Sequence, residues 1–487
     1  MADSETQAMP AEPPAGGAAR RPHGGRDLTK GAIASTLLIF ALPTLGTNIL
    51  QSLNGSINAI WVGRFLGENA LAATSNANLV LFLMLAAVFG FGLAATIMIG
   101  QNMGRRDIEA ARRAMGTAVG LFAIASIVIS IAGYWASPAI LHLLATPADA
   151  AALAQAYLRV IFIALPPLFV MTVITMGMRG TGDSMTPFLI MILNVLLDSG
   201  LNPVFIRGLA GAPRLGIGGA ATATAIAAYV SLFVLIVVIY ARDLTVRLRG
   251  RELRWLIPDP ALLKVILVKG IPIGLQMFVI SFAGLALMGL INHAGVDVVA
   301  AYGVTLQLWT YIQMPALAIG AAVSAMAAQN IGAQLWDRVD AVTRWGIIVN
   351  LLITAALILL VTLVDRPVLA LFLGGDSLAL PIARHIHLVA SWSFLMFGIT
   401  MVIFGTVRAN GSVIAPLVIL FIAMFPVRLG AVFALRPFIG TEAFWWTMPL
   451  SSLASMLMSL GYYRAGGWRT LHMRTVSPRE AAKQAAA

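Results

Sequence analysis

Long apolar runs separated by short polar segments make up most of the chain from residue 33 to residue 464. A helix that crosses a bilayer needs roughly 20 mostly apolar residues. Backbone groups inside hydrocarbon must be hydrogen-bonded within the protein, which favours helices as the spanning elements. We therefore predict an all-α integral membrane protein with twelve transmembrane helices, near residues 33–61, 69–99, 112–135, 156–178, 186–206, 216–241, 262–292, 298–325, 342–363, 386–408, 412–436 and 444–464.

The composition agrees with a lipid-embedded chain. Of the 487 residues, 59% are hydrophobic and only 11% are charged, and the mean hydropathy is +0.89. A soluble protein of this length needs more charge to cover its surface. The absence of cysteine excludes a disulfide framework, a thiolate metal site and a thiol nucleophile.

The basic residues indicate how the chain lies in the membrane. The net charge is +12, but the Arg residues occur in short clusters between apolar runs, so we expect no nucleic-acid partner. If the N-terminus is cytoplasmic, about three quarters of the Lys and Arg residues fall on the cytoplasmic side. We therefore expect a multi-pass protein of the bacterial inner (plasma) membrane with both termini in the cytoplasm.

Two halves of the chain resemble each other at a spacing of about 229 residues, as expected of transporter folds built from repeats. The sequence Gln-Asn-Met-Gly at 101–104 recurs as Gln-Asn-Ile-Gly at 329–332, and 179–182 recurs as 408–411. Each pair follows the second or the fourth predicted helix of its half, on the same membrane side. The pattern predicts two parallel six-helix repeats that form a two-lobed transporter.

The repeat and the polar segments divide the chain into five parts. We expect a disordered cytoplasmic tail at 1–28, an N-lobe of helices one to six at 29–241, and a basic cytoplasmic linker at 242–261. A C-lobe of helices seven to twelve follows at 262–465, and a cytoplasmic tail at 466–487.

Asp198 is the only acidic residue well inside a predicted span. An ionised Asp at the centre of a spanning helix costs about 2.5–3.5 kcal/mol on insertion scales, so such residues usually face a partner, a cavity or an ion pathway. Asn194, Asp198 and Asn202 follow an i, i+4, i+8 spacing and form one polar stripe. Asp198 could load a proton or hold Na⁺, or it could be a structural carboxylate that holds the first lobe together.

The first predicted helix has a second polar face, formed by Gln51, Asn54 and Asn58. Amide side chains in lipid need partners, so this face should point into the protein. It could meet the Asp198 stripe, line a substrate pathway, or make interhelical hydrogen bonds only.

The seventh and eighth predicted helices carry Gln276, Gln307 and Gln313, with Trp309 and several Met residues nearby. Aromatic and Met-rich surfaces adapt to varied apolar ligands, which would suit a substrate pathway. Packing or lipid contact is the alternative interpretation.

The sequence resembles the multidrug and toxic compound extrusion (MATE) family. The likeness covers about residues 30 to 475, and it rests on the order and spacing of segments at 43–64, 101–104, 179–187, 201–221 and 329–332. It implies two six-helix lobes in a V shape. It also implies export of organic cations or other amphipathic toxic compounds, driven by inward flow of H⁺ or Na⁺.

Two positions depart from the family pattern. Many members carry Asp in the first helix where this chain has Asn58. In the fifth helix, proton-coupled members have Asn followed four residues later by Asp, whereas here Asp198 precedes Asn202. These positions therefore differ from the family's usual carboxylate network. Our candidate ion-coupling residues are Asp198, Asn194, Asn202 and Asn58.

Together these observations predict a secondary active antiporter, a monomer surrounded by membrane lipid, that exports small organic molecules and needs no cofactor besides the coupling ion. A lipid-precursor flippase of the same superfamily and a non-transporting receptor or assembly protein are the alternatives. No phosphate-binding loop and no catalytic constellation occur, so we do not expect an enzyme or ATP-driven transport.

Overall fold

A computed structural model describes residues 25–143, 148–374, 376–471 and 473. The first half of the chain forms six long helices, α1 (Ile33–Leu66), α2 (Glu68–Gly104), α3 (Ile108–Leu143), α4 (Ala148–Gly180), α5 (Met185–Arg207) and α6 (Ile217–Ala241). The second half forms α7 (Pro260–Ile291), α8 (Val296–Gly332), α9 (Trp336–Leu363), α10 (Asp365–Leu373), α11 (Ala379–Ala390), α12 (Ser393–Ala409), α13 (Ile414–Ile422), α14 (Gly430–Ile439) and α15 (Glu442–Ala465). Short 3-10 helices include η2 (Gly250–Leu256) and η5 (Gly467–Thr470), and the π-helical segment η4 (Ala423–Leu429) joins α13 to α14.

Each of the twelve predicted stretches coincides with a helix or with a group of consecutive helices. The tenth is divided between α11 and α12, which meet at an angle of 45°. The eleventh runs through α13, η4 and α14. By length and composition, ten of the described helices can cross a membrane, and the bent pair makes eleven. The predicted all-α multi-span fold is confirmed.

Helix ends follow local backbone chemistry. Gly208 ends α5 and Gly466 ends α15 in the left-handed conformation, with φ of 74° and 75°, which only glycine adopts at little steric cost. At the start of α7, the Asp259 carboxylate accepts hydrogen bonds from the Ala261 and Leu262 amides, and Pro260 occupies the first turn. This is the arrangement expected of an N-cap followed by proline.

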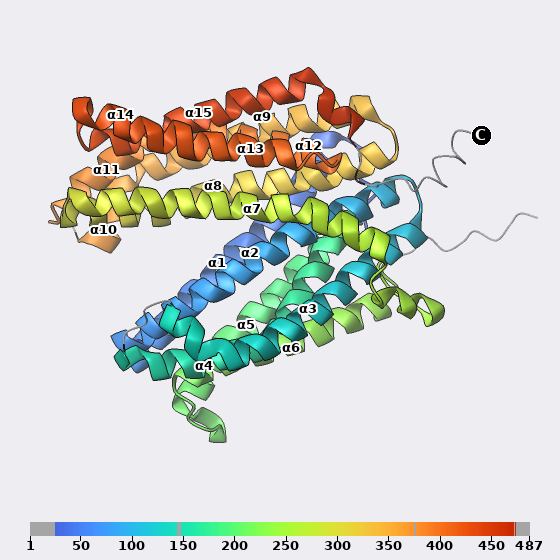
Figure 1. Ribbon diagram of the computed structural model, residues 1–487, viewed down its shortest axis with the longest axis horizontal. Coiled ribbons are helices and arrows are strands. Elements are labelled where there is room, and N and C mark those ends of the chain that lie inside the picture. Colours follow the sequence, from blue (N-terminus) through green and yellow to red (C-terminus); the bar gives the residue numbers. More distant parts are fainter. Residues whose placement is uncertain (1–24, 144–147, 375, 472, 474–487) are drawn as a thin grey trace, which may run out of the picture.

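The helices form two bundles arranged as a V (Figure 1). We call the bundle of α1–α6 the N-lobe and that of α7–α15 the C-lobe. The bundles meet at the end where α2 and α8 end and diverge toward the other end. Small residues allow the close approach of the two lobes. A Cβ added to Gly90 of α2 would lie 2.4 Å from the backbone nitrogen of Gly274 of α7.

Candidate functional site

The polar stripe predicted on the fifth span lies on α5 and faces the interior of the N-lobe. Asn194, Asp198 and Asn202 are buried, with 7%, 1% and 0% of their surfaces exposed. Asp198 lies about 14 Å along the helix from the nearer end of α5. The helix therefore places a buried carboxylate well inside an apolar span.

Three neutral side chains donate hydrogen bonds to the Asp198 carboxylate. Asn54 Nδ2 of α1 donates to Oδ2 at 2.8 Å, and Thr224 Oγ1 of α6 donates to Oδ1 at 2.9 Å. Asn202 Nδ2 donates to the Asp198 backbone carbonyl at 2.8 Å and to Oδ1 at 3.3 Å. Among the residues that the structure describes, no ion pair joins Asp198 to a cation.

Neighbouring groups extend this polar centre. The Tyr157 hydroxyl of α4 donates to Asn78 Oδ1 of α2 at 3.4 Å. The Tyr157 side chain also lies near Asn58 and Asp198, so the predicted residue Asn58 lies close to the centre. Asn194, one turn from Asp198, instead donates to Ser231 Oγ of α6 at 3.3 Å. Asn194 therefore connects α5 to α6 and does not touch the carboxylate directly.

Several buried oxygen atoms around Asp198 accept no hydrogen bond from the described chain. They are the Oδ1 atoms of Asn54, Asn58 and Asn202. Carboxylate and amide oxygens are acceptors only, and a carboxylate inside a transmembrane segment commonly marks an ion pathway or a proton relay. The donor set therefore fits a monovalent cation or a proton. No cluster of three His, Cys, Asp or Glu residues occurs in the described part of the chain.

Two members of this centre were not singled out from the sequence. Thr224 lies in an Ala-rich helix and also bonds the Ala220 carbonyl of its own helix at 3.3 Å, as helical Thr commonly does. Tyr157 lies near the predicted start of the fourth span. Neither has a sequence signal that distinguishes it from an ordinary helix residue.

The predicted substrate-pathway residues lie in different surroundings. Gln51 on α1 and Gln307 on α8 are exposed, and Gln313 is half-buried. Gln276 is buried, donates to the Val413 carbonyl at 3.2 Å and accepts from the Arg408 guanidinium. Gln276 is therefore hydrogen-bonded within the C-lobe.

Trp309 is only 2% exposed. Its ring packs edge-on against Tyr302 and Phe394, with centroid distances of 6.2 and 5.9 Å. It belongs to an aromatic cluster inside the C-lobe that also contains Phe444 and Trp445.

The chain matches the MatE family twice, over residues 43–204 and again over 272–433. This chain belongs to the MatE family. The two matches have the same direction and span the two lobes, so the predicted parallel repeat and the family resemblance are both confirmed, and the family is one of transporters, not enzymes.

The MatE relatives cover nearly the whole chain. A probable multidrug resistance protein of Bacillus subtilis, YoeA, is 34% identical over 90% of this chain and 94% of its own length. The probable multidrug resistance protein NorM of Thermotoga maritima is 24% identical over 93% of this chain and 96% of its own length. A multidrug resistance MATE family transporter of the MOP superfamily, solved in an outward-facing conformation, superposes with a TM-score of 0.84 at 21% identity. That match covers 92% of this chain and all of the solved chain.

The repeated Gln residues of this MatE protein cross between the lobes. Gln101 Nε2 of α2 donates to the Ala409 carbonyl at the end of α12, at 2.7 Å. Gln329 Nε2 of α8 donates to the Gly180 carbonyl at the end of α4, at 3.0 Å. The two hydrogen bonds are equivalent under the repeat, because each Gln reaches from its own lobe to the other. We call this pair the interlobe latch.

Glycines make the latch possible. A Cβ at Gly104 would lie 1.9 Å from the Gln329 carbonyl oxygen, and a Cβ at Gly332 would lie 2.0 Å from the Gln101 carbonyl oxygen. The ends of α2 and α8 are thus in backbone contact. Any larger residue at either position would force the lobes apart.

A segment before α1 crosses the same junction. The Leu28 amide donates to Gln329 Oε1 at 3.0 Å, and Asn330 Nδ2 donates to the Leu28 carbonyl at 3.2 Å. The Arg26 amide donates to the Gly182 carbonyl in the N-lobe at 3.2 Å. Leu28 is fully buried, so the described end of the predicted tail, residues 25–28, is attached to both lobes. Residues 1–24 lie outside the described residues.

Proposed function

We propose that this MatE protein is a secondary active antiporter that exports small organic molecules, cationic or amphipathic in character, in exchange for H⁺ or Na⁺. Membership of the family and the multidrug resistance names of its relatives support this function. The single observation that carries the ion coupling is the buried Asp198 carboxylate with neutral donors only.

A buried carboxylate without a cationic partner is unstable as an anion, because desolvation disfavours the charged form. A proton or a Na⁺ ion would neutralise it. The unpartnered Oδ1 atoms of Asn54, Asn58 and Asn202 would supply further oxygen ligands to a bound Na⁺. Binding and release of the cation would change the charge of the N-lobe interior by one unit, which is the event that ion coupling requires.

The arrangement of the lobes supports alternating access. In our proposal the predicted N-lobe of 29–241 and C-lobe of 262–465 move relative to each other, with residues 242–261 as the linker. The interlobe latch and the segment at 25–28 hold the lobes together at one end of the molecule, which we call the latch end. The cycle requires that the latch breaks when the transporter opens to that side.

The proposed orientation follows from the distribution of Lys and Arg. The latch end, with both termini, would face the cytoplasm of a bacterial cell, and the open end of the V would face outward. Gln51 and Gln307, which are exposed, are our candidates for contact with substrate, and Gln313 is a third. We expect the transporter to act as a monomer.

Ethidium efflux from an exporter-deficient bacterial strain tests this function. Cells that express the chain should lose ethidium faster than vector controls. A protonophore should abolish the difference if H⁺ is the coupling ion, whereas removal of Na⁺ should abolish it if Na⁺ is. An efflux rate that neither the protonophore nor the removal of Na⁺ changes would contradict ion-coupled antiport.

A further inference from the structure

The linker helix η2 has three distinct faces because a 3-10 helix repeats every three residues. Gly250, Leu253 and Leu256 share the first face, and Arg251 and Arg254 share the second. The third face contains Glu252 and Trp255. This short helix therefore has an apolar face, a basic face and a third face, with Glu252 and Trp255, that points toward the protein.

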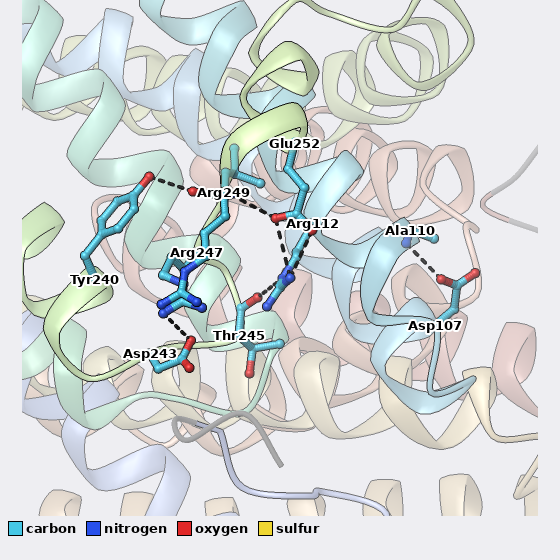
Figure 2. A network of polar contacts seen from close by, with 10 residues as sticks. Asp107, Ala110, Arg112, Tyr240, Asp243, Thr245, Arg247, Arg249 and Glu252 are labelled. Atoms are coloured by element: carbon cyan, nitrogen blue, oxygen red, sulfur yellow. Dashed lines mark hydrogen bonds and ion pairs between the residues drawn. The ribbon is translucent and has the colours of Figure 1, made fainter. Parts of the chain in front are cut away.

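The inward-facing positions fasten η2 to α3. Arg112 Nη1 of α3 donates to Glu252 Oε1 at 3.1 Å, and Arg112 Nε donates to the Thr245 carbonyl at 2.8 Å (Figure 2). A Cβ at Gly116 of α3 would lie 2.9 Å from the Trp255 side chain. The linker is thus a rigid extension of the N-lobe.

The surface of α3 under η2 continues as the lipid-facing surface of that helix. A Cβ at Gly120 would lie 1.7 Å from the Leu256 carbonyl oxygen. One and two turns further along the same face are Ile124 and Val128, which are 55% and 60% exposed. Apolar side chains exposed at this spacing on a spanning helix contact lipid. The linker helix therefore lies at the membrane boundary, on the outer side of the N-lobe.

Two faces of η2 point away from the protein, one apolar and the other basic, and they are adjacent. Leu253, Leu256 and the following Ile257 are 48%, 37% and 76% exposed. Arg251 and Arg254 are exposed, and no ion pair joins them to a carboxylate within the described chain.

The acidic residues near η2 are already paired with other cations. Asp243 pairs with Arg247 at 2.6 Å, Glu252 with Arg112 at 3.1 Å, and Asp259 with Arg113. The two Arg residues on the outward face therefore present uncompensated positive charge beside the apolar side chains.

We propose that η2 is an interfacial anchor that binds anionic phospholipid headgroups of the leaflet at the latch end of the molecule. Leu253, Leu256 and Ile257 enter the boundary between headgroups and acyl chains. Arg251 and Arg254 bind the phosphates. Segments that combine apolar and basic faces bind membrane interfaces in this way.

Depth measurement tests the position of the anchor in the full-length protein. The chain has no cysteine, so a spin label on Ile257→Cys reports on a single site. In nanodiscs, we expect the label to be more accessible to oxygen than to a water-soluble nickel reagent. A label on Asp337→Cys, exposed in the first turn of α9 at the same end of the C-lobe, is the water-facing control. Equal accessibility of the two labelled sites to the nickel reagent would overturn the proposal.

Lipid titration tests whether the positive charge of Arg251 and Arg254 binds anionic lipid. Phosphatidylglycerol, increased in phosphatidylcholine nanodiscs, should raise the thermal unfolding midpoint of the wild-type protein. Each basic residue near an anionic surface contributes about fivefold in affinity, so Arg251→Gln with Arg254→Gln should weaken the apparent lipid affinity about 30-fold.

The matched control is Arg344→Gln with Arg464→Gln, which removes the same charge from exposed positions outside η2. It should respond to phosphatidylglycerol as the wild type does. Three results would overturn the proposal. These are no effect of phosphatidylglycerol on the wild type, an equal loss in the control, and an equal shift produced by soluble glycerol phosphate.

Discussion

Two carboxylates are buried among the described residues, and their hydrogen-bond partners differ in charge. Asp365, at the start of α10 in the C-lobe, is 3% exposed and accepts from Arg384 Nε at 3.0 and 3.1 Å. Asp198 in the N-lobe is 1% exposed and accepts only from neutral groups. Asp365 has a permanent counter-charge, so it needs no ion from outside. Asp198 lacks one, which is why we propose that it exchanges a cation.

The repeat extends this comparison to the two lobes. At the 229-residue shift between the two family matches, Asp198 corresponds to Val427 and Asn54 to Ala283. At these two positions the C-lobe has apolar residues in place of the carboxylate and its amide donor. Its interior contains an aromatic cluster instead. A symmetric fold therefore carries an asymmetric site. The buried charge beside the equivalent position of the C-lobe is the guanidinium of Arg428, and our proposal assigns cation binding to Asp198 of the N-lobe.

Replacing Asp198 with Asn should have the largest effect on transport. The attraction between a buried carboxylate and a cation at 4 Å is about 4 kcal/mol at an effective dielectric constant of 20. The substitution should therefore weaken cation binding by two to three orders of magnitude and abolish coupled efflux. Asp365→Asn is the matched control, and it should lower stability while ion coupling persists. Equal loss of coupling in both variants would remove the distinction between the two carboxylates.

Substitution at the interlobe latch should have the next largest effect. Gly104→Ala places a Cβ against the Gln329 carbonyl oxygen, and overpacking of this kind costs about 1–3 kcal/mol. The lobes should separate more often at the latch end. A membrane-impermeant maleimide, applied from that side, should then label Ala325→Cys, which is 1% exposed, faster than in the Gly104 parent.

The control for the latch is Gly284→Ala on α7, where an added Cβ meets nothing within 4 Å. It should leave the labelling rate unchanged. If both glycine variants change the rate equally, the close contact at Gly104 does not hold the lobes together.

Removing the amide donor of α1 should have a smaller effect. Asn54→Ala gives the N-lobe the residue type that the C-lobe already has at the equivalent position. Hydrogen bonds to charged groups contribute about 1.5–3 kcal/mol, so the affinity for the coupling ion should fall at least about tenfold. Isothermal titration or ion-dependent efflux would measure it. Asn48→Ala, on the same helix, should leave the affinity near the wild-type value.

The smallest expected effect is that of Thr224→Val. Its hydroxyl is one of several donors to Asp198 and is also within reach of the Ala220 carbonyl, so its loss should weaken ion binding about fivefold. Thr222→Val is the matched control, because Thr222 bonds only the Gly218 carbonyl of its own helix. An equal change in both variants would indicate a general effect on α6.

The sequence predicts the helices and the repeat well, because long apolar runs in lipid leave few alternatives to helices. It also places Asp198 in the membrane and Asn202 beside it, since both follow from position and helical spacing. Contacts between helices were harder to predict. The polar face of α1 is visible in the sequence, but the hydrogen bond from Asn54 to Asp198, 144 residues away, depends on how the helices pack.

The latch illustrates the same limit. The equivalence of Gln101 and Gln329 is visible in the sequence, but a repeat does not reveal which carbonyl each side chain reaches across the interface. The sequence also does not determine the surroundings of Trp309, because an aromatic residue in a span can line a pathway, face lipid or pack in a core. The structure places its ring in the C-lobe core.

The most direct test of the central claim is substrate-triggered ion flux in proteoliposomes that contain purified wild-type, Asp198→Asn or Asp365→Asn protein. Internal fluorescent indicators for H⁺ and Na⁺ would report the flux after ethidium is added. We predict that the wild type and Asp365→Asn move one of the two ions in response to substrate, and that Asp198→Asn moves neither. Substrate-triggered flux of wild-type size through Asp198→Asn would contradict the assignment of ion coupling to the polar centre of the N-lobe.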